Sequence, residues 1–341
     1  METRTELSTI GEFGLIKRIE SNFPITQKET IKGIGDDAAV VDTEGKKLLI
    51  STDLLMEGVH FDLAYTPLRH LGYKSVAVNV SDIAAMNGIP KQITVSLGLS
   101  NRFSVEAIDE LYAGIKVACQ EYNIDLIGGD TSSSRGGLAI SITVLGTAND
   151  DQIVYRNTAK VSDIICVSGD LGAALMGLQS LEREKQVFMA NPNMQPELKD
   201  KDYVVQRQLK PEARMDIVHE LRDLGVVPTS MIDVSDGLAS ELLHICKNSG
   251  VGAVIFEDKI PIDDQTYLTA TEMNFSPMTA ALNGGEDYEL LFTVKQEDYE
   301  KIKNMSDVSF IGYITKEVEG AQMMMKSGTL VKLTSPGYEH F

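Results

Sequence analysis

The chain of 341 residues carries 31 Lys or Arg against 50 Asp or Glu, which gives a formal net charge of −19 at pH 7. At roughly 100–200 residues per domain, this length predicts two domains, and the 43% hydrophobic composition is that of an ordinary globular protein. The acidic excess repels nucleic-acid phosphates, and no stretch approaches about 18 consecutive apolar residues. We therefore expect no nucleic acid and no membrane as partner, and an anionic substrate would need a metal ion as counter-charge.

The cysteines and the N-terminus bear on the compartment. Cys119, Cys166 and Cys246 are far apart, odd in number and form no CxxC pair, so they predict buried thiols rather than disulfides or a zinc site. The first residues, METRTELSTIGEFG, lack the basic start and apolar run of a signal peptide. We expect a cytoplasmic protein.

Hydrophobic periodicity predicts helices and strands that alternate through the first half of the chain, which indicates a mixed α/β fold. Gly88 and Pro90 end one predicted helix, and Ser104 caps the start of the next. The predicted elements are a helix over 11–22, a strand over 47–52, a helix over 73–86, a strand over 93–99, a helix over 105–119, and strands over 125–127 and 138–145.

A polar turn at 147–151 marks the predicted domain boundary, with one domain at 1–150 and the second at 151–341. Residues 183–203 are polar, contain two prolines and show no periodicity, so we expect a surface insertion there. Pro211 is expected in the first turn of a helix that runs to Leu224. The other predicted elements are a strand over 164–167, a helix from 172, a strand over 231–234, a helix over 236–248, and strands over 251–256 and 288–294.

The segment Gly33-Ile-Gly-Asp-Asp-Ala38 matches the letters of a dinucleotide-binding fingerprint, but in the wrong context. No apolar strand precedes it, and Asp36 and Asp37 would direct two carboxylates at a pyrophosphate. No phosphate-binding P-loop sequence occurs anywhere in the chain. Adjacent carboxylates after flexible glycines suit a hard cation better, although such a segment by itself is commonly only an acidic turn.

Further aspartates stand beside Gly, Ser or Thr, where they also act as turn formers and helix caps. For Asp236 a capping role is at least as well supported as a functional one. Asp82 differs because it falls inside a helical pattern, where Asp is unfavourable unless it has a task, and Asp53 follows an apolar strand, where ligands bind in α/β folds. Oxygen ligands without clustered His or Cys select Mg²⁺ or Mn²⁺. Several Mg²⁺ ions between domains are therefore predicted on Asp37, Asp53, Asp82, Asp130, Asp233 and Asp236.

Two other features qualify as candidate binding elements. In Asn283-Gly-Gly-Glu-Asp-Tyr-Glu289 the glycines allow close backbone approach to a ligand, which Glu286 and Asp287 would contact unless they only cap the turn. His60 is the most notable of five histidines, although a lone histidine is more often an ordinary surface or core residue. His244 is interpreted as structural because it falls in the middle of a predicted helix.

Seven segments that occur in order resemble the thiamine-monophosphate kinase family, within the aminoimidazole-ribonucleotide-synthetase-like superfamily. Each is weak alone, but the ordered set is specific and covers the chain from about residue 10 to the C-terminus. The stretch 183–203 is longer than the family core needs. The segments are GIGDDAAV (33–40), STDLLMEGVHF (51–61), GYKSVAVNVSDIAAMNGIPK (72–91), GGDTSSS (128–134), MIDVSDGLASEL (231–242), NGGEDYELLFTV (283–294) and GYEHF (337–341).

The resemblance implies a two-domain α/β fold whose N-terminal sheet dimerises into a β-barrel, while the C-terminal domain closes the cleft. It also implies transfer of the γ-phosphoryl group of ATP to thiamine monophosphate, with Mg²⁺ as cofactor. By similarity, the metal ligands would be Asp37, Thr52, Asp53, Asp82, Asp130, Asp233 and Asp236. ATP would be held by Tyr112, Gly129, Asp130, Arg156 and Ser235. Thiamine monophosphate would be contacted by His60, Glu286 and Tyr338.

The chemistry of the residues agrees with this reaction. A phosphate monoester has a second pKa of about 6, so the attacking phosphate is mostly ionised at pH 7 and needs no general base. The lack of a Ser/His/Asp or Cys/His arrangement is then expected, and we predict direct in-line transfer without a phosphoenzyme. The alternatives are another ATP-dependent synthetase or maturation factor of the superfamily, or a non-catalytic Mg–nucleotide-binding protein. The first would use a reactive terminal cysteine, and the second would lack metal carboxylates.

Overall fold

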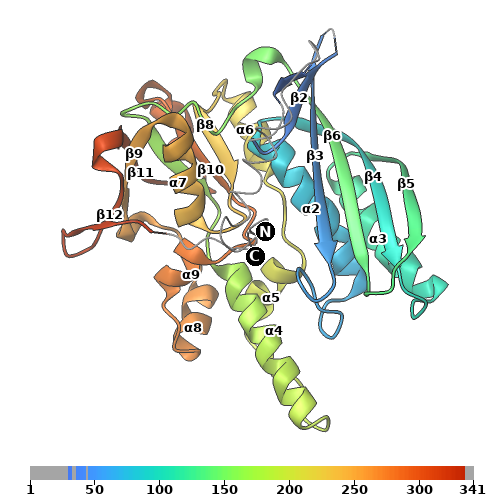
Figure 1. Cartoon of the computed structure of the whole chain (residues 1–341). Coiled ribbons are helices and arrows are strands. Elements are labelled where there is room, and N and C mark those ends of the chain that lie inside the picture. The colour runs from blue at the N-terminus through green and yellow to red at the C-terminus, as the bar shows by residue number, and fades with distance from the viewer. Residues whose placement is uncertain (1–29, 33–35, 44, 335–341) are drawn as a thin grey trace, which may run out of the picture.

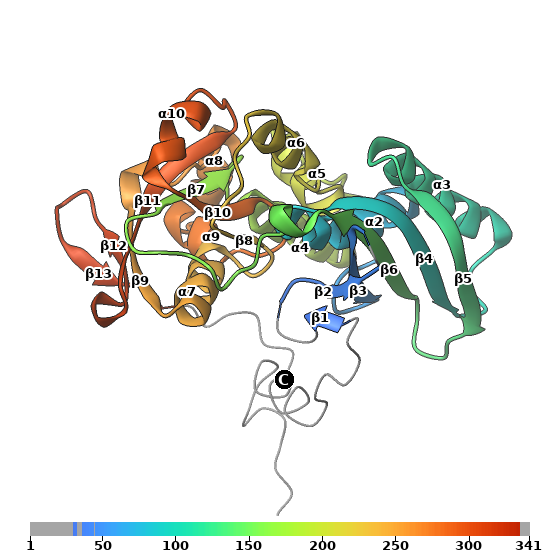
Figure 2. The ribbon, with the colours of Figure 1, turned by 90° about the horizontal axis from the view of Figure 1, so that it is seen from above.

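The computed structural model describes residues 30–32, 36–43 and 45–334, which form two mixed α/β parts lying side by side (Figures 1 and 2). Each part contains one mixed sheet. The helix predicted over 11–22 and Tyr338, which is predicted to contact the substrate, lie outside the described residues. Among the helices that are described, none is long and apolar enough to span a bilayer.

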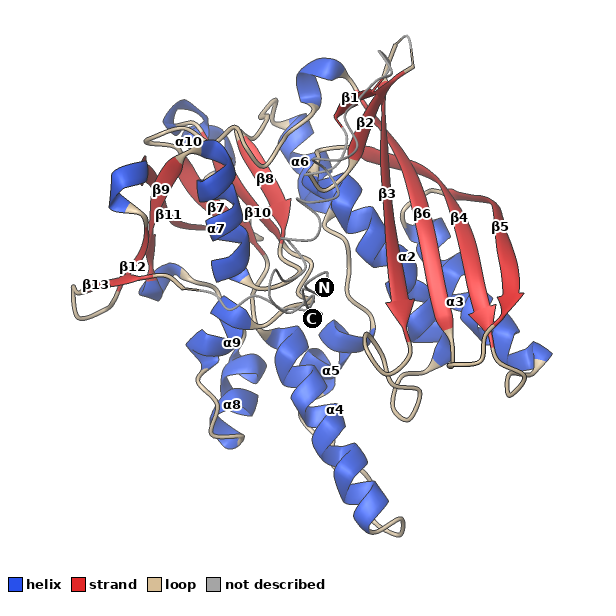
Figure 3. Cartoon of the chain, in the orientation of Figure 1, coloured by secondary structure: helices blue, strands red, loops and turns tan. Residues whose placement is uncertain are grey.

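The first part is an open six-stranded sheet with two helices on one face (Figure 3). Its strand order is β1-β2-β3-β6-β4-β5, antiparallel except for the parallel pair β4–β5. Helices α2 (Leu68–Ala85) and α3 (Val105–Glu121) pack against each other, and α2 also packs on β3, β4 and β6. The strands are β1 (Thr30–Lys32), β2 (Ala39–Asp42), β3 (Lys47–Met56), β4 (Ile89–Leu99), β5 (Asp125–Ser133) and β6 (Ala139–Ala148).

The opposite face of this sheet is exposed. Alternation along β3 buries Leu49 and Leu55 under the helices, whereas Leu54 and Met56 point the other way and are 54% and 37% exposed. Strand β5 is exposed along its whole length. In the described residues the six strands form an open sheet and not a closed barrel.

The second part is a seven-stranded sheet with helices around it, in the strand order β13-β12-β9-β11-β7-β10-β8. The strands are β7 (Ile164–Ser168), β8 (Ser230–Asp233), β9 (Val251–Phe256), β10 (Leu290–Val294), β11 (Val308–Lys316), β12 (Ala321–Met324) and β13 (Leu330–Lys332). The helices are α4 (Ala173–Ala190), α5 (Asp202–Leu209), α6 (Met215–Asp223), α7 (Leu238–Ser249), α8 (Asp264–Glu272), α9 (Pro277–Asn283) and α10 (Tyr299–Ile302).

Several predicted elements are confirmed, including the strand over 93–99, the helix over 105–119 and the strand over 251–256. Ser104 caps α3, because its side chain accepts a hydrogen bond from the Ala107 N–H at 3.3 Å. The strand predicted over 47–52 continues to Met56, so Asp53 lies inside β3 and not after it.

Two predictions in the second half are wrong. The stretch 183–203 is not all insertion, because α4 continues to Ala190 and projects away from the body (Figure 1). Residues 182–186 of this helix are polar, and the apolar Phe188 and Met189 of its last turn are exposed, so the outer part shows no apolar face with a helical period. Pro211 does not begin a helix: it follows Lys210, the C-cap of α5, whose φ of −140° is extended as expected before proline, and α6 starts only at Met215.

Helix α2 is buried along nearly its whole length. All residues from Leu71 to Ala85 are buried except Asp82. One side of the helix packs on the first sheet, and another contacts β8, α5 and α6 of the second part. This position between the two parts makes α2 the main element that positions the site described below.

Two glycines permit the close packing of α2 on α3. A Cβ atom on Gly72 would lie 2.0 Å from the Leu111 carbonyl oxygen, and one on Gly114 would lie 1.9 Å from the Arg69 carbonyl oxygen. Both obstacles are helix backbone, which cannot yield as the end of a side chain does. The helices would have to separate to accept either methyl group.

Gly72→Ala should therefore lower the free energy of unfolding by about 1–3 kcal/mol, the usual cost of overpacking a core. Urea unfolding followed by circular dichroism measures this change. Gly136→Ala is the matched control, because nothing lies within 4 Å of the position of its Cβ. Identical unfolding curves for the two variants would show that the contact is not tight.

Candidate active site

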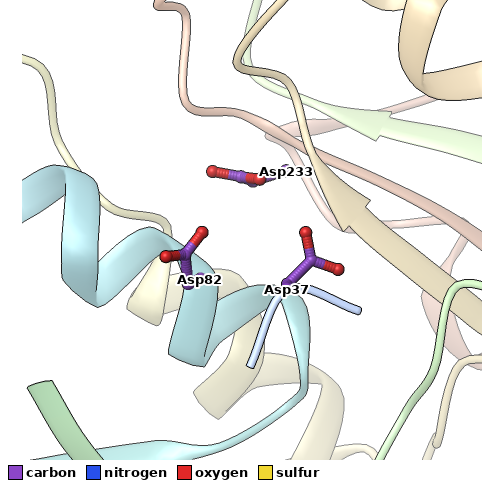
Figure 4. A group of neighbouring side chains, drawn as sticks. All are labelled: Asp37, Asp82 and Asp233. Atoms are coloured by element: carbon purple, nitrogen blue, oxygen red, sulfur yellow. The ribbon is translucent and has the colours of Figure 1, made fainter. Parts of the chain in front are cut away.

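Three aspartates from distant parts of the sequence point toward a common space (Figure 4). Asp37 precedes β2, Asp82 lies in the last turn of α2, and Asp233 is the last residue of β8. One carboxylate oxygen from each lies within 4.8 Å of the others. The group therefore joins the first part, through Asp37 and Asp82, to the second part, through Asp233.

Hydroxyl and amide groups hold these carboxylates in place. The Ser81 hydroxyl donates to Asp233 Oδ2 at 2.6 Å, and the Ser51 hydroxyl donates to Asp82. Asn79, buried in α2, accepts a hydrogen bond from the Asp53 N–H at 3.0 Å. The polar residues of α2 thus orient the acidic groups on both sides of the helix.

The protein environment makes ionisation of these carboxyl groups costly. Burial, outweighing the attraction of Arg156, raises the pKa of Asp37 to about 7. Burial, with repulsion from Asp233, raises the pKa of Asp53 to about 6. The pKa of Asp82 is raised well above its usual value, first by burial and then by Asp53 and Asp233. Burial also raises the pKa of Asp233. Four neighbouring carboxylates that resist ionisation suit a divalent cation, because its charge removes their mutual repulsion.

A cavity of about 770 Å³ extends from these carboxylates between the two parts. At the acidic end it is lined by Arg156, Ser235 and Asp236, for which the sequence predicts contacts with ATP or metal. The Arg156 Nε lies 3.2 Å from Asp37 Oδ2, and its guanidinium also pairs with Asp36 at 3.4 Å. A fixed cation beside the acidic group is suited to an anionic ligand that shares the site with metal ions.

At its other end the cavity combines apolar, aromatic and acidic side chains. His60 and Glu286, the residues expected to contact substrate, both line it, together with Tyr65, Leu175 and Leu178. The His60 Nδ1 accepts a hydrogen bond from the Met56 N–H at 3.0 Å, which fixes the orientation of the ring. This end is suited to an organic group with apolar surface and polar edges.

Other predicted site residues do not face this cavity in a single chain. The Thr52 side chain lies on the exposed face of the sheet, where it donates to the Ile142 carbonyl at 3.0 Å. Gly129 and Asp130 lie on the edge strand β5, and Tyr112 lies on α3. Asp130 is in register with Ser96, Ser141 and Leu54, so three strand spacings, about 14 Å, separate it from β3.

The structure also corrects the interpretation of two other residues. Asp236 is not a helix cap, because α7 is preceded by Gly237 and has no side-chain cap hydrogen bond. His244 is not only structural, because it lines the cavity. Burial, with repulsion from Arg156 and Lys247, lowers the pKa of His244 to about 4.

The ionisable residues of the cavity wall that sequence reasoning missed include Glu241 and Lys74. The Glu241 carboxylate is buried and accepts a hydrogen bond from the Asp236 N–H at 3.0 Å. An acidic residue in a first helical turn is common for electrostatic reasons, so it gave no distinct signal. Lys74 did give one, since it interrupts the same apolar helix as Asp82, eight residues earlier.

Comparison with known proteins identifies the family. Two family models match the chain, "AIR synthase related protein, N-terminal domain" over residues 35–148 and "AIR synthase related protein, C-terminal domain" over residues 161–323. The thiamine-monophosphate kinase of Aquifex aeolicus is 34% identical over 336 residues, which cover 98% of this chain and 99% of that protein. The thiamine-monophosphate kinase of Bacillus subtilis is 35% identical, with coverage of 97% and 100%.

The chain belongs to the thiamine-monophosphate kinase family. A solved structure of AaThiL complexed with AMPPCP and TMP covers 100% of both chains, with a TM-score of 0.84 and 33% identity. The thiamine-monophosphate kinase of Stenotrophomonas maltophilia K279a has a TM-score of 0.73 at 31% identity and covers 95% of this chain and 98% of that one. The mixed α/β two-domain fold expected from the family resemblance is thereby confirmed.

Asp82→Asn should stabilise the metal-free chain at pH 8 while abolishing turnover. The raised pKa of Asp82 means that its ionisation weakens folding as the pH rises, so an uncharged amide removes a cost. We expect the variant to have a higher Tm without metal. Each kcal/mol gained in the free energy of unfolding corresponds to a rise in Tm of about 2–4 °C in domains of 150–250 residues. We also expect at least about a 100-fold loss of activity, through loss of a metal ligand.

Differential scanning calorimetry with and without Mg²⁺, combined with an activity assay, measures both effects. Asp109→Asn on α3 is the control, because Asp109 is exposed and lies outside the cavity. Near-normal activity of Asp82→Asn would remove this residue from the metal site.

Proposed function

We propose that the chain transfers the γ-phosphoryl group of ATP to thiamine monophosphate, giving thiamine diphosphate, in an Mg²⁺-dependent reaction. The observation that carries this proposal is the meeting of Asp37, Asp82 and Asp233, of which Asp37 and Asp233 line a cavity between the two parts. The family relationship supplies the reaction and both substrates.

The donor set favours Mg²⁺ among the cations that proteins bind. Every side chain in the group offers carboxylate oxygen, the ligand that hard divalent cations prefer. The proposed ligands within one chain are Asp37, Asp53, Asp82, Asp233 and Asp236, because Thr52 and Asp130 of the same chain do not face the cavity. Bound Mg²⁺ would neutralise the phosphate charges and let two polyanions meet in an acidic protein.

The chain itself positions the reactants. Arg156 and Ser235 both line the cavity, where we expect them to hold phosphate oxygens. The ligand phosphate is the nucleophile and is already ionised near pH 7, so none of these side chains has to remove a proton. Transfer is then direct and in line, with both phosphates held by fixed groups and without a phosphorylated side chain.

We also propose that the chain is a homodimer whose partner completes the site. Leu54 and Met56 on the open face of the sheet are 54% and 37% exposed. A second copy packed on this face would cover these side chains and join the two sheets toward a barrel. It would also bring Asp130 of the partner to a cavity that Asp130 of the same chain does not line.

The proposed compartment is the cytoplasm. Cys119, Cys166 and Cys246 are all free thiols, and Cys166 and Cys246 are buried. Thiols without disulfide partners are the usual state in a reducing compartment. This supports the compartment expected from the sequence.

An ADP-release assay with Mg·ATP tests the reaction. The acceptors to compare are thiamine monophosphate, thiamine and aminoimidazole precursors. We expect ADP only with thiamine monophosphate. Turnover with an aminoimidazole precursor would favour the synthetase alternative, and no turnover with any acceptor would favour a non-catalytic nucleotide-binding protein.

His60→Ala should weaken binding of thiamine monophosphate more than binding of ATP, because His60 lines the cavity together with Glu286, Tyr65 and apolar side chains. A rise in KM of about tenfold for thiamine monophosphate corresponds to about 1.4 kcal/mol. His70→Ala, which removes an exposed histidine outside the cavity, is the control. An unchanged KM for thiamine monophosphate in His60→Ala would remove His60 from the substrate site.

Mixing two inactive variants tests the dimer. In a heterodimer of Asp82→Asn and Asp130→Asn chains, one of the two shared sites keeps both aspartates. Random exchange of subunits should restore about a quarter of the normal activity. If each site were built from one chain, every site in the mixture would carry a defect and no activity would return.

A further inference from the structure

Lys74 is a buried cation on the wall of the cavity. It lies in α2 and is only 2% exposed. Its Nζ is 3.0 Å from Glu286 Oε1 and donates to the Gln208 carbonyl at 3.1 Å. Burying an ammonium group costs free energy unless it has polar partners. The position of the Lys74 Nζ is therefore set by these two contacts with the second part.

Glu286 receives support at both carboxylate oxygens. Lys74 contacts Oε1, and the Gln208 side-chain amide donates to Oε2 at 2.8 Å. The Glu286 side chain nevertheless remains 29% exposed, toward the cavity that it lines. A carboxylate has about four lone-pair sites, so it can still accept hydrogen bonds from a ligand.

The backbone around Glu286 is equally constrained. Glu286 and Tyr288 adopt positive φ values of 65° and 52°, which side-chain-bearing residues rarely do. Their N–H groups donate to the Ser235 and Val234 carbonyls at 2.7 and 2.9 Å. The loop is thereby fixed to the segment that follows Asp233. The direction of the Glu286 side chain is set by these backbone hydrogen bonds and by the contacts of its carboxylate with Lys74 and Gln208.

We propose that Lys74 is a positioning residue for the substrate. It holds the Glu286 carboxylate in the one orientation in which its remaining lone pairs face the cavity, toward a cationic heterocycle with N–H donors. Lys74 and Asp82 lie eight residues apart on one face of α2, about 12 Å along the helix. Helix α2 therefore positions Glu286 through Lys74, for contact with the heterocycle. It also carries Asp82, which belongs to the acidic group proposed to bind metal and phosphate.

This inference rests on the proposed function, so the wild-type chain is assayed first. Lys74→Met keeps the length of the side chain and removes its charge. We expect the KM for thiamine monophosphate to rise at least about tenfold, because the Glu286 carboxylate loses the contact that orients it. The KM for ATP and kcat should change by less than about threefold, since the phosphate end is built from other residues.

A double-mutant cycle identifies the route of the effect. If Lys74 acts through Glu286, then Lys74→Met should add little to the KM increase already caused by Glu286→Gln. Gln208→Met, which removes the other donor without leaving an unpaired charge, should raise the same KM in the same direction. Lys116→Met, at an exposed lysine of α3, is the control.

The outcomes separate the two proposals. No turnover by the wild-type chain contradicts the proposed function itself. An active wild type with an unchanged KM in both Lys74→Met and Gln208→Met overturns the positioning role. A full effect of Lys74→Met in the Glu286→Gln background also overturns it, because Lys74 would then act on the substrate directly. If Lys74→Met does not fold, Gln208→Met and Glu286→Gln alone decide.

Discussion

The site depends on a helix that is buried on several sides and still carries polar groups. Helix α2 packs on the first sheet and against the second part, so each of its polar side chains must find a partner in protein. Asn79 bonds to β3, whereas Ser81 and Lys74 bond to residues of the second part. The two parts therefore fit together in an arrangement that satisfies these groups, and the same arrangement assembles the carboxylates.

The cost of this arrangement is electrostatic. Like charges that are buried near one another oppose folding once they ionise, and the raised pKa values of Asp37 and Asp53 express that cost. Because these values exceed those of an unfolded chain, the metal-free protein loses stability as the pH rises through them. A divalent cation bound between these carboxylates removes their repulsion and so restores stability. A few of the acidic residues behind the net charge of −19 would therefore act at this site, and not on the overall surface charge.

Much of the fold and part of the site could be predicted from the sequence. Periodicity located most strands and helices, and the unfavourable position of Asp82 inside a helix correctly marked it for the acidic group. Local polarity misled in the outer part of α4, because residues 182–186 are polar and still continue the helix. The direction of a side chain across a sheet was also missed: neighbouring residues point to opposite faces, so Thr52 and Asp53 do not share a surface.

The central claim is that these carboxylates exchange protons for a divalent cation. Isothermal titration of the nucleotide-free chain with Mg²⁺ at pH 6 and pH 8, in buffers of different ionisation enthalpy, tests it directly. Because the pKa of Asp37 is about 7 and that of Asp53 about 6, we expect weaker binding at pH 6, accompanied by proton release. Equal affinity at the two pH values without proton release would contradict the account.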